Sequence, residues 1–174
     1  MIDTIKKTRA ELESLYGLFT SLKEETFSPK FSFFVLRNLG LLEGEITALN
    51  ETRTKLHESI KEYDTERMQL AEKHADKDDA GSPIIEGGSY KIIDNLLSFQ
   101  AEFATLQEKH IDTIAKFQSL EQGLVDLLSE EVDQKIMKVS YLDLPEDVFN
   151  IEKLFQFKDF FKETEEELDE LLMG

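Results

Sequence analysis

The chain of 174 residues contains no cysteine and no long uninterrupted hydrophobic run. Without cysteine it can form no disulfide, thiolate nucleophile or thiolate metal site, which fits a reducing compartment such as the cytoplasm. The N-terminus carries charges where a signal peptide has its apolar segment, and Arg37 and Asp126 interrupt the longest apolar clusters. We therefore expect a cytoplasmic protein with no membrane-spanning helix.

The charge is strongly negative and unevenly distributed. The formal net charge is −17, of which residues 1–75 contribute −2 and residues 76–174 contribute −15. Such a field repels the phosphates of nucleic acids and of anionic lipid surfaces. The composition therefore favours a protein partner over direct binding to nucleic acid or membrane.

With 40% hydrophobic residues, the chain 1–174 can build one packed domain. Its N-terminal pattern predicts an amphipathic helix. Within residues 2–26, apolar side chains recur at three- and four-residue steps on one helical face. This helix is expected to stop before Ser28 and Pro29, which supply an N-cap and a first position for the next one.

The next segment, residues 30–75, shows a coiled-coil repeat. Nine of its twelve seam positions are apolar, and the steps alternate between four and three residues, which is the heptad spacing. The pattern predicts a long first helix. The seam positions are Val35, Leu39, Leu42, Ile46, Leu49, Arg53, Leu56, Ile60, Tyr63, Arg67, Leu70 and His74.

A β-hairpin and a second heptad helix are expected after this first helix. Residues 84–93 place two β-branched runs around Gly87-Gly88, which is typical of a hairpin with a primed turn. The heptad resumes over 94–130 with eight of ten seam positions apolar. The simplest arrangement is a mainly α fold: a long antiparallel coiled-coil helical hairpin with a small β-hairpin at its tip, plus N- and C-terminal helices.

The remaining segments complete this prediction. Residues 135–141 alternate as a short strand does, and residues 150–173 carry the broad apolar face of a last helix. No internal repeat of 20–50 residues is detected.

Folding the two long helices about the 84–93 tip predicts their register. Facing positions should have numbers that sum to roughly 170, so that Arg53 faces Phe117 and Arg67 faces Phe103. Our hypothesis is that each guanidinium stacks on the facing ring while its tip stays in water.

No catalytic, cofactor or metal site is expected. The residues three before His57, His74 and His110 are not the glutamates that a helical di-iron site requires. The stretch from Asp76 imitates a calcium loop only in part, because Gly87 stands where that loop needs a bidentate glutamate. No nucleophile motif is present, so we expect a protein that is not an enzyme.

The C-terminal third is the candidate contact surface. Phenylalanines are most often core residues, but because these spread around two helical faces, a contact with another subunit or partner is the sharper hypothesis for four of them. The acidic run Glu163–Glu170 is either a solvated face or a dock for a basic partner. The contact candidates are Phe155, Phe157, Phe160, Phe161, Glu165, Glu166 and Glu167.

The order of several short motifs resembles an uncharacterised family of small bacteriophage proteins, a domain of unknown function. The resemblance covers nearly the whole chain through loose motifs, and the two long helices are longer here than in that family. It implies a phage context, with no active residues to transfer. The motifs are Pro29-Lys30-Phe31-Ser32-Phe33, Lys77-Asp78, Gly81-x-Pro83-Ile84-Ile85, Tyr90-Lys91-Ile92, Phe99, Leu127-Leu128-x-x-x-Val132, Val139-x-x-Leu142-x-x-Leu144-Pro145-Glu146-Asp147 and Phe160-Phe161.

Three functions stay open. The first is a phage structural or assembly protein that forms a homo-oligomer, in the bacterial host cytoplasm or in the virion. The second is an acidic inhibitor of a host nucleic-acid-binding or defence protein. The third is a chaperone subunit, because the order helix, hairpin, helix is similar to that of prefoldin.

Overall fold

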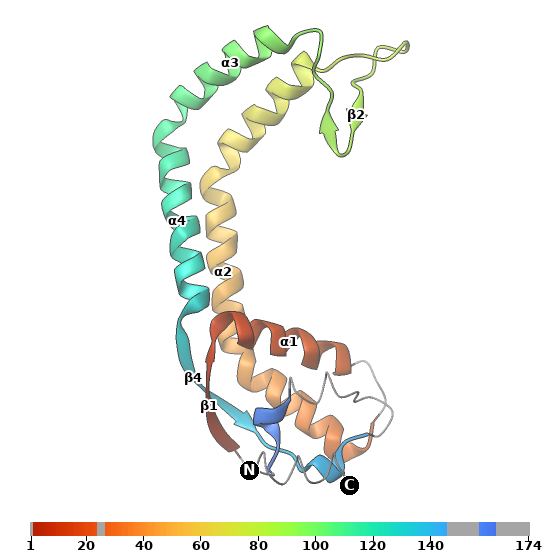
Figure 1. The fold of residues 1–174 in the computed structure, drawn as a ribbon, viewed down its shortest axis with the longest axis vertical. Helices are drawn as coiled ribbons and strands as arrows, with labels where there is room; N and C mark the ends of the chain where they lie inside the picture. The colour runs from red at the N-terminus through yellow and green to blue at the C-terminus, as the bar shows by residue number, and fades with distance from the viewer. Residues whose placement is uncertain (1, 24–26, 146–156, 163–174) are drawn as a thin grey trace. The chain divides into compact units, whose positions relative to one another are not determined.

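A computed structural model describes residues 2–23, 27–145 and 157–162 (Figure 1). The protein is mainly α-helical, with two small antiparallel sheets in this part of the chain. It divides into two compact units where the sequence predicted one domain. Unit 1 combines residues 1–51 with 125–174, and unit 2 consists of residues 52–124.

The N-terminal prediction is wrong for its first seven residues. Ile2–Thr8 forms strand β1, and helix α1 runs only from Arg9 to Lys23. A capping box fixes this boundary: the Glu11 backbone N–H donates to Thr8 Oγ1 at 3.2 Å, and the Thr8 N–H donates to the Glu11 carboxylate at 2.8 Å. Because the box satisfies N–H groups that the helix leaves unpaired, it favours a start at Arg9.

Strand β1 pairs along its whole length with strand β4, Glu131–Met137, in an antiparallel register from Ile2 opposite Met137 to Thr8 opposite Glu131. The predicted strand at 135–141 therefore begins and ends four residues earlier. Ion pairs link the two strands, with Lys6 Nζ 2.8 Å from a Glu131 oxygen.

Helix α2 is a single helix of 46 residues, Pro29–His74, within one residue of the predicted segment. Its start follows the predicted pattern, because Ser28 Oγ accepts from the Phe31 N–H and Pro29 occupies the first position. The second long helix is divided into α3, Leu96–Lys109, and α4, Ile111–Ser129. His110 lies at the break with a φ of −107° and a ψ of 18°, outside helical geometry.

The small hairpin is shorter than the segment predicted for it. Strands β2, Ile85–Glu86, and β3, Ser89–Tyr90, pair around Gly87 and Gly88. Both glycines have positive φ, as a type I′ turn requires. The connection to α2 is held by Asp76, whose carboxylate accepts from the backbone N–H groups of Ile93 and Asp94 at 3.1 Å.

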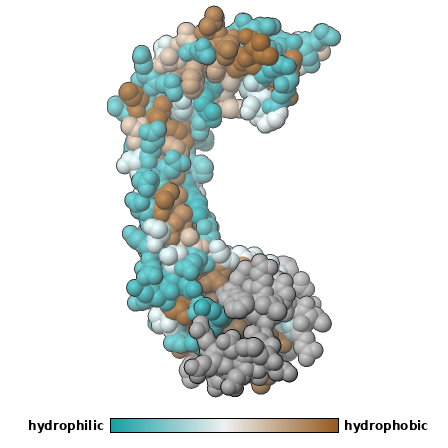
Figure 2. All heavy atoms as spheres, viewed as in Figure 1, coloured by the Kyte–Doolittle hydropathy of each residue, from teal (hydrophilic) through white to brown (hydrophobic). Residues whose placement is uncertain are grey.

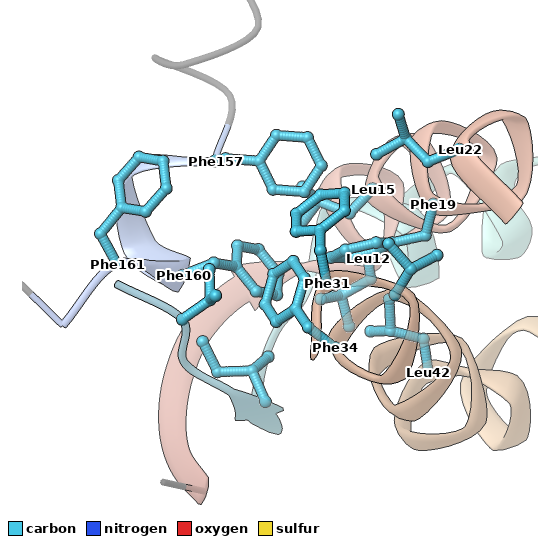
Figure 3. Close-up of a cluster of buried hydrophobic side chains, with 13 residues drawn as sticks. Leu12, Leu15, Phe19, Leu22, Phe31, Phe34, Leu42, Phe157, Phe160 and Phe161 are labelled. Carbon is cyan, nitrogen blue, oxygen red and sulfur yellow. The ribbon is translucent and has the colours of Figure 1, made fainter. Parts of the chain in front are cut away.

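The core of unit 1 is a phenylalanine cluster centred on Phe19 of α1 (Figure 3). The Phe19 ring meets the rings of Phe34, Phe157 and Phe160 edge to face, with centroids 5.6, 5.1 and 5.2 Å away. Such edge contacts add to the stabilisation that burial alone provides. The segment 157–162 is thereby fixed against α1 and α2, and its backbone also bonds Val139.

A buried amide joins α2 to the end of β4. Asn38 is fully buried, and its side chain accepts from the Met137 N–H at 2.8 Å and donates to the carbonyls of Met137 and Phe34 at 3.1 Å. Asn38 thus extends the hydrogen bonding of the sheet with a side chain. The Gln134 amide makes a second link, donating to the Leu41 carbonyl at 2.8 Å.

We predict that Asn38→Ala lowers the free energy of unfolding by about 1–3 kcal/mol, because it leaves the part-buried Met137 amide and carbonyl without their side-chain partner. Urea denaturation followed by circular dichroism measures the change. Gln118→Ala, which removes an exposed amide from α4, serves as the control and should change the free energy by less than about 0.5 kcal/mol. Equal effects of the two substitutions would contradict the role of Asn38.

Candidate functional site

The predicted contact residues of the C-terminal third fall into two groups. Phe157, Phe160 and Phe161 are buried in the core of unit 1, so they are not the contact surface predicted for them. The core alternative holds for these three side chains because each fills space beside α1 or α2. Phe155, Glu165, Glu166 and Glu167 lie outside the described residues, as does most of the helix predicted at 150–173.

Unit 2 contains two matching clusters of charged and histidine side chains between α2 and α3, which we call the clasps. Clasp 1 consists of Lys73 and His74 of α2 with Glu102 of α3. The Lys73 Nζ lies 2.6 and 2.9 Å from the two Glu102 oxygens, and the His74 Nε2 lies 3.2 Å from Oε1. The Phe99 ring contacts the imidazole of His74, with centroids 6.0 Å apart.

Clasp 2 repeats this arrangement with the helices exchanged. It consists of Lys109 and His110, at the end of α3, with Glu66 of α2. The Lys109 Nζ lies 2.6 and 2.7 Å from the Glu66 oxygens, the His110 Nε2 lies 3.3 Å from Oε2, and the Tyr63 ring contacts the imidazole with centroids 5.6 Å apart. The helices are therefore antiparallel at this point.

The two clasps arise from a sequence repeat. Every member of clasp 2 is 36 residues from its counterpart in clasp 1. The two rings that contact the imidazoles, Tyr63 and Phe99, are also 36 residues apart. The segments 66–76 and 102–112 share the pattern Glu-x-x-x-Leu-x-Glu-Lys-His-x-Asp. The prediction of no internal repeat is thus wrong: a short motif at an offset of 36 residues creates a local two-fold symmetry.

The groove between α2 and α3 follows the same symmetry. Its eight lining residues are four pairs separated by 36 positions, with leucines between the charged side chains. The lining residues are Glu66, Gln69, Leu70, Lys73, Glu102, Thr105, Leu106 and Lys109.

The charges of the clasps act on one another. The hydrogen bond from Lys109 holds the pKa of Glu66 below its ordinary value, with a smaller contribution from His110. Lys73 lowers the pKa of Glu102 in the same way. Both carboxylates are solvent-accessible and ionised at neutral pH, and both histidines are buried.

The observed register differs from the predicted one. The cross-helix contacts join residues whose numbers sum to 173–176, not roughly 170. Arg67 bonds Asp64 of its own helix, and Phe103 stacks on Phe99 of its own helix, so the predicted Arg67 to Phe103 stack is wrong. Continued along α2, the observed register places Arg53 level with Gln122, whereas the prediction placed it opposite Phe117.

The shifted register has a structural consequence at the start of α3. His74 is the last residue of α2 and contacts Phe99, so the first turn of α3 extends beyond the end of α2. Leu96 and Leu97 therefore have no α2 side chain to pack on, and Leu97 is 82% exposed. Ile93 and the hairpin residue Ile85 are exposed as well. We call these four side chains the tip patch, and Figure 2 shows apolar surface at this end of unit 2.

In the calcium-like loop, the carboxylates of Asp76 and Asp78 accept hydrogen bonds from backbone N–H groups. Asp76 accepts from backbone groups of residues 93 and 94, and Asp78 Oδ1 accepts from the N–H groups of Ala80 and Ser82 at 2.9 and 2.8 Å. These bonds shape a turn. Within the described ranges, no group of three or more histidine and acidic side chains is arranged to hold a metal ion.

No protein-family model, curated protein or solved structure matches the chain. None of the helices in the described part is long and apolar enough to cross a membrane.

Cysteine cross-linking tests the register, because the natural chain has no cysteine to interfere. We predict that the pairs Glu66→Cys with Lys109→Cys, and Lys73→Cys with Glu102→Cys, react within one molecule with a short bis-maleimide at least 10-fold faster than Arg67→Cys with Phe103→Cys. Mass spectrometry of the digested products measures the yield. Faster linkage of positions 67 and 103 would support the register of the sequence prediction.

The lowered pKa values of Glu66 and Glu102 predict that the pairing of α2 with α3 weakens in acid. A carboxyl whose pKa is lowered by folding contributes stability above its ordinary pKa of 4.5, and loses it as the pH falls through the folded value. Amide protection in α3 should therefore fall below about pH 4.5 in hydrogen exchange. The decrease should be smaller in Glu66→Gln/Glu102→Gln, and unchanged in the exposed control Glu121→Gln.

Proposed function

We propose that this protein is a non-enzymatic interaction protein, built on α2 pairing with α3 and α4 as a long antiparallel helical hairpin. The clasps support antiparallel pairing between α2 and α3. The heptad pattern of both segments supports its extension along α4. In this proposal the helix pair presents surfaces to other proteins, and no described cluster performs chemistry.

The observation that carries the proposal is the tip patch. Large apolar side chains that are exposed together mark surfaces for other proteins more often than isolated exposed ones do. The overhang of α3 explains the exposure of Leu96 and Leu97, and Ile85 and Ile93 are exposed in the adjoining connection. Helix α4 also exposes Ile111, and none of its side chains is buried.

We place this function in a bacteriophage, as a structural or assembly protein of the virion or of the infected cytoplasm. The order of short motifs along the chain supports that setting, as does a net charge that disfavours nucleic acid. The partner is then another copy of the chain or another phage protein.

Light scattering on size-separated protein tests the proposal. We expect wild-type protein to form an oligomer at micromolar concentration and Leu97→Glu to shift it to the monomer, because a charge buried in an apolar contact is costly. Leu142→Glu is the matched control, since Leu142 is 79% exposed but belongs to unit 1. A wild-type chain that stays monomeric at high concentration would count against self-assembly through the tip patch.

The hairpin β2–β3 favours a second candidate, a prefoldin-like chaperone subunit. Its strands form a two-stranded sheet with Ile85 exposed, and such edges can pair with strands of other subunits. In this case Ile85→Asp/Ile92→Asp should dissociate the oligomer while Leu97→Glu leaves it intact. The two sets of variants therefore separate the two candidates.

A further inference from the structure

Strand β1 has one partner strand, β4 (Figure 1). The other side of β4 lies against α2, where Asn38 bonds the Met137 backbone and the Gln134 amide bonds the Leu41 carbonyl. On the other side of β1, no described strand pairs with it. The sheet therefore has one edge covered by α2 and one open edge, which is the outer side of β1.

Hydrogen bonds at both ends of the sheet show which backbone groups of β1 point to this open edge. In an antiparallel pair, residues alternate between directing their N–H and C=O groups toward the partner strand and away from it. Because the Met137 backbone is bonded to Asn38, its facing residue Ile2 directs its own groups to the open edge. The Arg9 N–H donates to the Glu130 carbonyl at 3.2 Å, which gives the same alternation from the other end. The outward residues of β1 are Ile2, Thr4, Lys6 and Thr8.

The outward groups of β1 are only partly satisfied within the chain. The Thr4 N–H donates to the neighbouring Asp3 carboxylate at 2.8 Å, and the Thr8 N–H belongs to the capping box with Glu11. For the Lys6 N–H and the carbonyls of Thr4 and Lys6, the described ranges hold no hydrogen-bond partner. Thr4 and Lys6 are exposed. Unpaired N–H and C=O groups along an exposed strand are a template for a further strand.

We propose that β1 of a second copy of the chain pairs with this edge, so that the two sheets join into one antiparallel sheet of four strands in the order β4–β1–β1–β4. The strands pair around a two-fold axis at Ile5, and facing positions have numbers that sum to 10. Each Lys6 N–H then donates to the Thr4 carbonyl of the other copy, and each Thr4 N–H exchanges its bond to Asp3 for the Lys6 carbonyl of the other copy. The Lys6 side chain leaves the edge accessible, because its Nζ is held 2.8 Å from Glu131 of β4.

The sequence of β1 is complementary to itself in this register. Asp3 faces Lys7 of the other copy at two symmetric positions, and Ile5 faces its own equivalent. Opposite charges and β-branched side chains that face each other across an antiparallel pair stabilise it. Asp3 and Lys7 also form ion pairs within their own chain, with Lys138 and Asp159, and both groups have capacity for a further hydrogen bond. This complementarity favours a second copy of the chain over an unrelated strand.

The neighbouring registers are less favourable. Only even sums bring the outward groups of the two strands together, because all outward residues have even numbers. A sum of 12 places Lys6 opposite Lys6 of the other copy, and a sum of 8 places Ile5 opposite Asp3. The register with a sum of 10 also pairs the whole strand from Ile2 to Thr8, whereas each slip leaves residues unpaired. The order of residues in β1 therefore specifies one register. This interface lies in unit 1 and does not depend on the tip patch.

Disulfide trapping tests this pairing in the full chain carrying Leu97→Glu, so that the result is independent of association through the tip patch. Two short strands make a weak contact, so we expect dimers at concentrations on the order of 0.5 mM and monomers at micromolar concentration. Position 5 lies on the two-fold axis, in a pair without backbone hydrogen bonds whose Cα atoms approach to about 4.5 Å, which is within disulfide range. Ile5→Cys should therefore oxidise to a covalent dimer roughly 10-fold faster than Thr4→Cys, which faces position 6 of the other copy.

A proline variant isolates the contribution of the backbone, in the same Leu97→Glu chain. Lys6→Pro removes the outward N–H at a position where an edge strand tolerates proline, whereas Lys6→Thr loses the same side chain and keeps the N–H. In sedimentation equilibrium at about 0.5 mM, Lys6→Thr should dimerise as its parent does, and Lys6→Pro should be monomeric. Circular dichroism checks that both variants are folded. Equal oxidation rates of Ile5→Cys and Thr4→Cys, or equal association of Lys6→Pro and Lys6→Thr, would overturn the proposal.

Discussion

Helix α2 imposes the main constraint on this molecule, because a helix of 46 residues cannot bury its own apolar stripe. Each half of α2 solves this with a different partner. In unit 1, Phe31 and Phe34 pack into the phenylalanine cluster with α1 and the 157–162 segment. In unit 2, α2 packs against α3. Few side chains are fully buried there, and ion pairs link the two helices. One continuous helix thus belongs to a unit with a dense aromatic core and to a unit held largely by charge.

Some boundaries could be predicted because local chemistry determines them. Ser28 and Pro29 start α2 as expected, and Gly87-Gly88 forms the predicted turn with positive φ at both residues. The capping box of Thr8 and Glu11 could also have been recognised in the sequence. The helical spacing of apolar residues across 2–8 instead led to a predicted helix there. The break at His110 was less accessible, since the heptad pattern continues through it. Of the contact candidates, Phe157, Phe160 and Phe161 were misassigned because composition does not show which surface a short segment meets.

The register error has a physical origin in the connection between the helices. A connection that left His74, the end of α2, level with Leu96, the start of α3, would give a sum of 170, but the contacts give values about five higher. The difference means that α3 starts beyond the end of α2, which exposes Leu96 and Leu97. Asp76 holds this offset, because its carboxylate caps the N–H groups of Ile93 and Asp94 and fixes where α3 begins. This set of exposed hydrogen bonds thereby contributes both to the register and to the exposure of the tip patch.

The repeated motif also explains why slipped registers are disfavoured. Glu66 and Lys73 are separated by seven residues, as are Glu102 and Lys109. In the observed pairing each glutamate faces the lysine of the opposite helix. A slip of one heptad in one direction would place Glu66 opposite Glu102, and a slip in the other direction would place Lys73 opposite Lys109. Heptad slips preserve the apolar seam and are therefore the cheapest errors of a helical hairpin. Here each of the two slips would bring like charges together. The repeated motif therefore disfavours both slipped registers, which hydrophobic packing alone would tolerate.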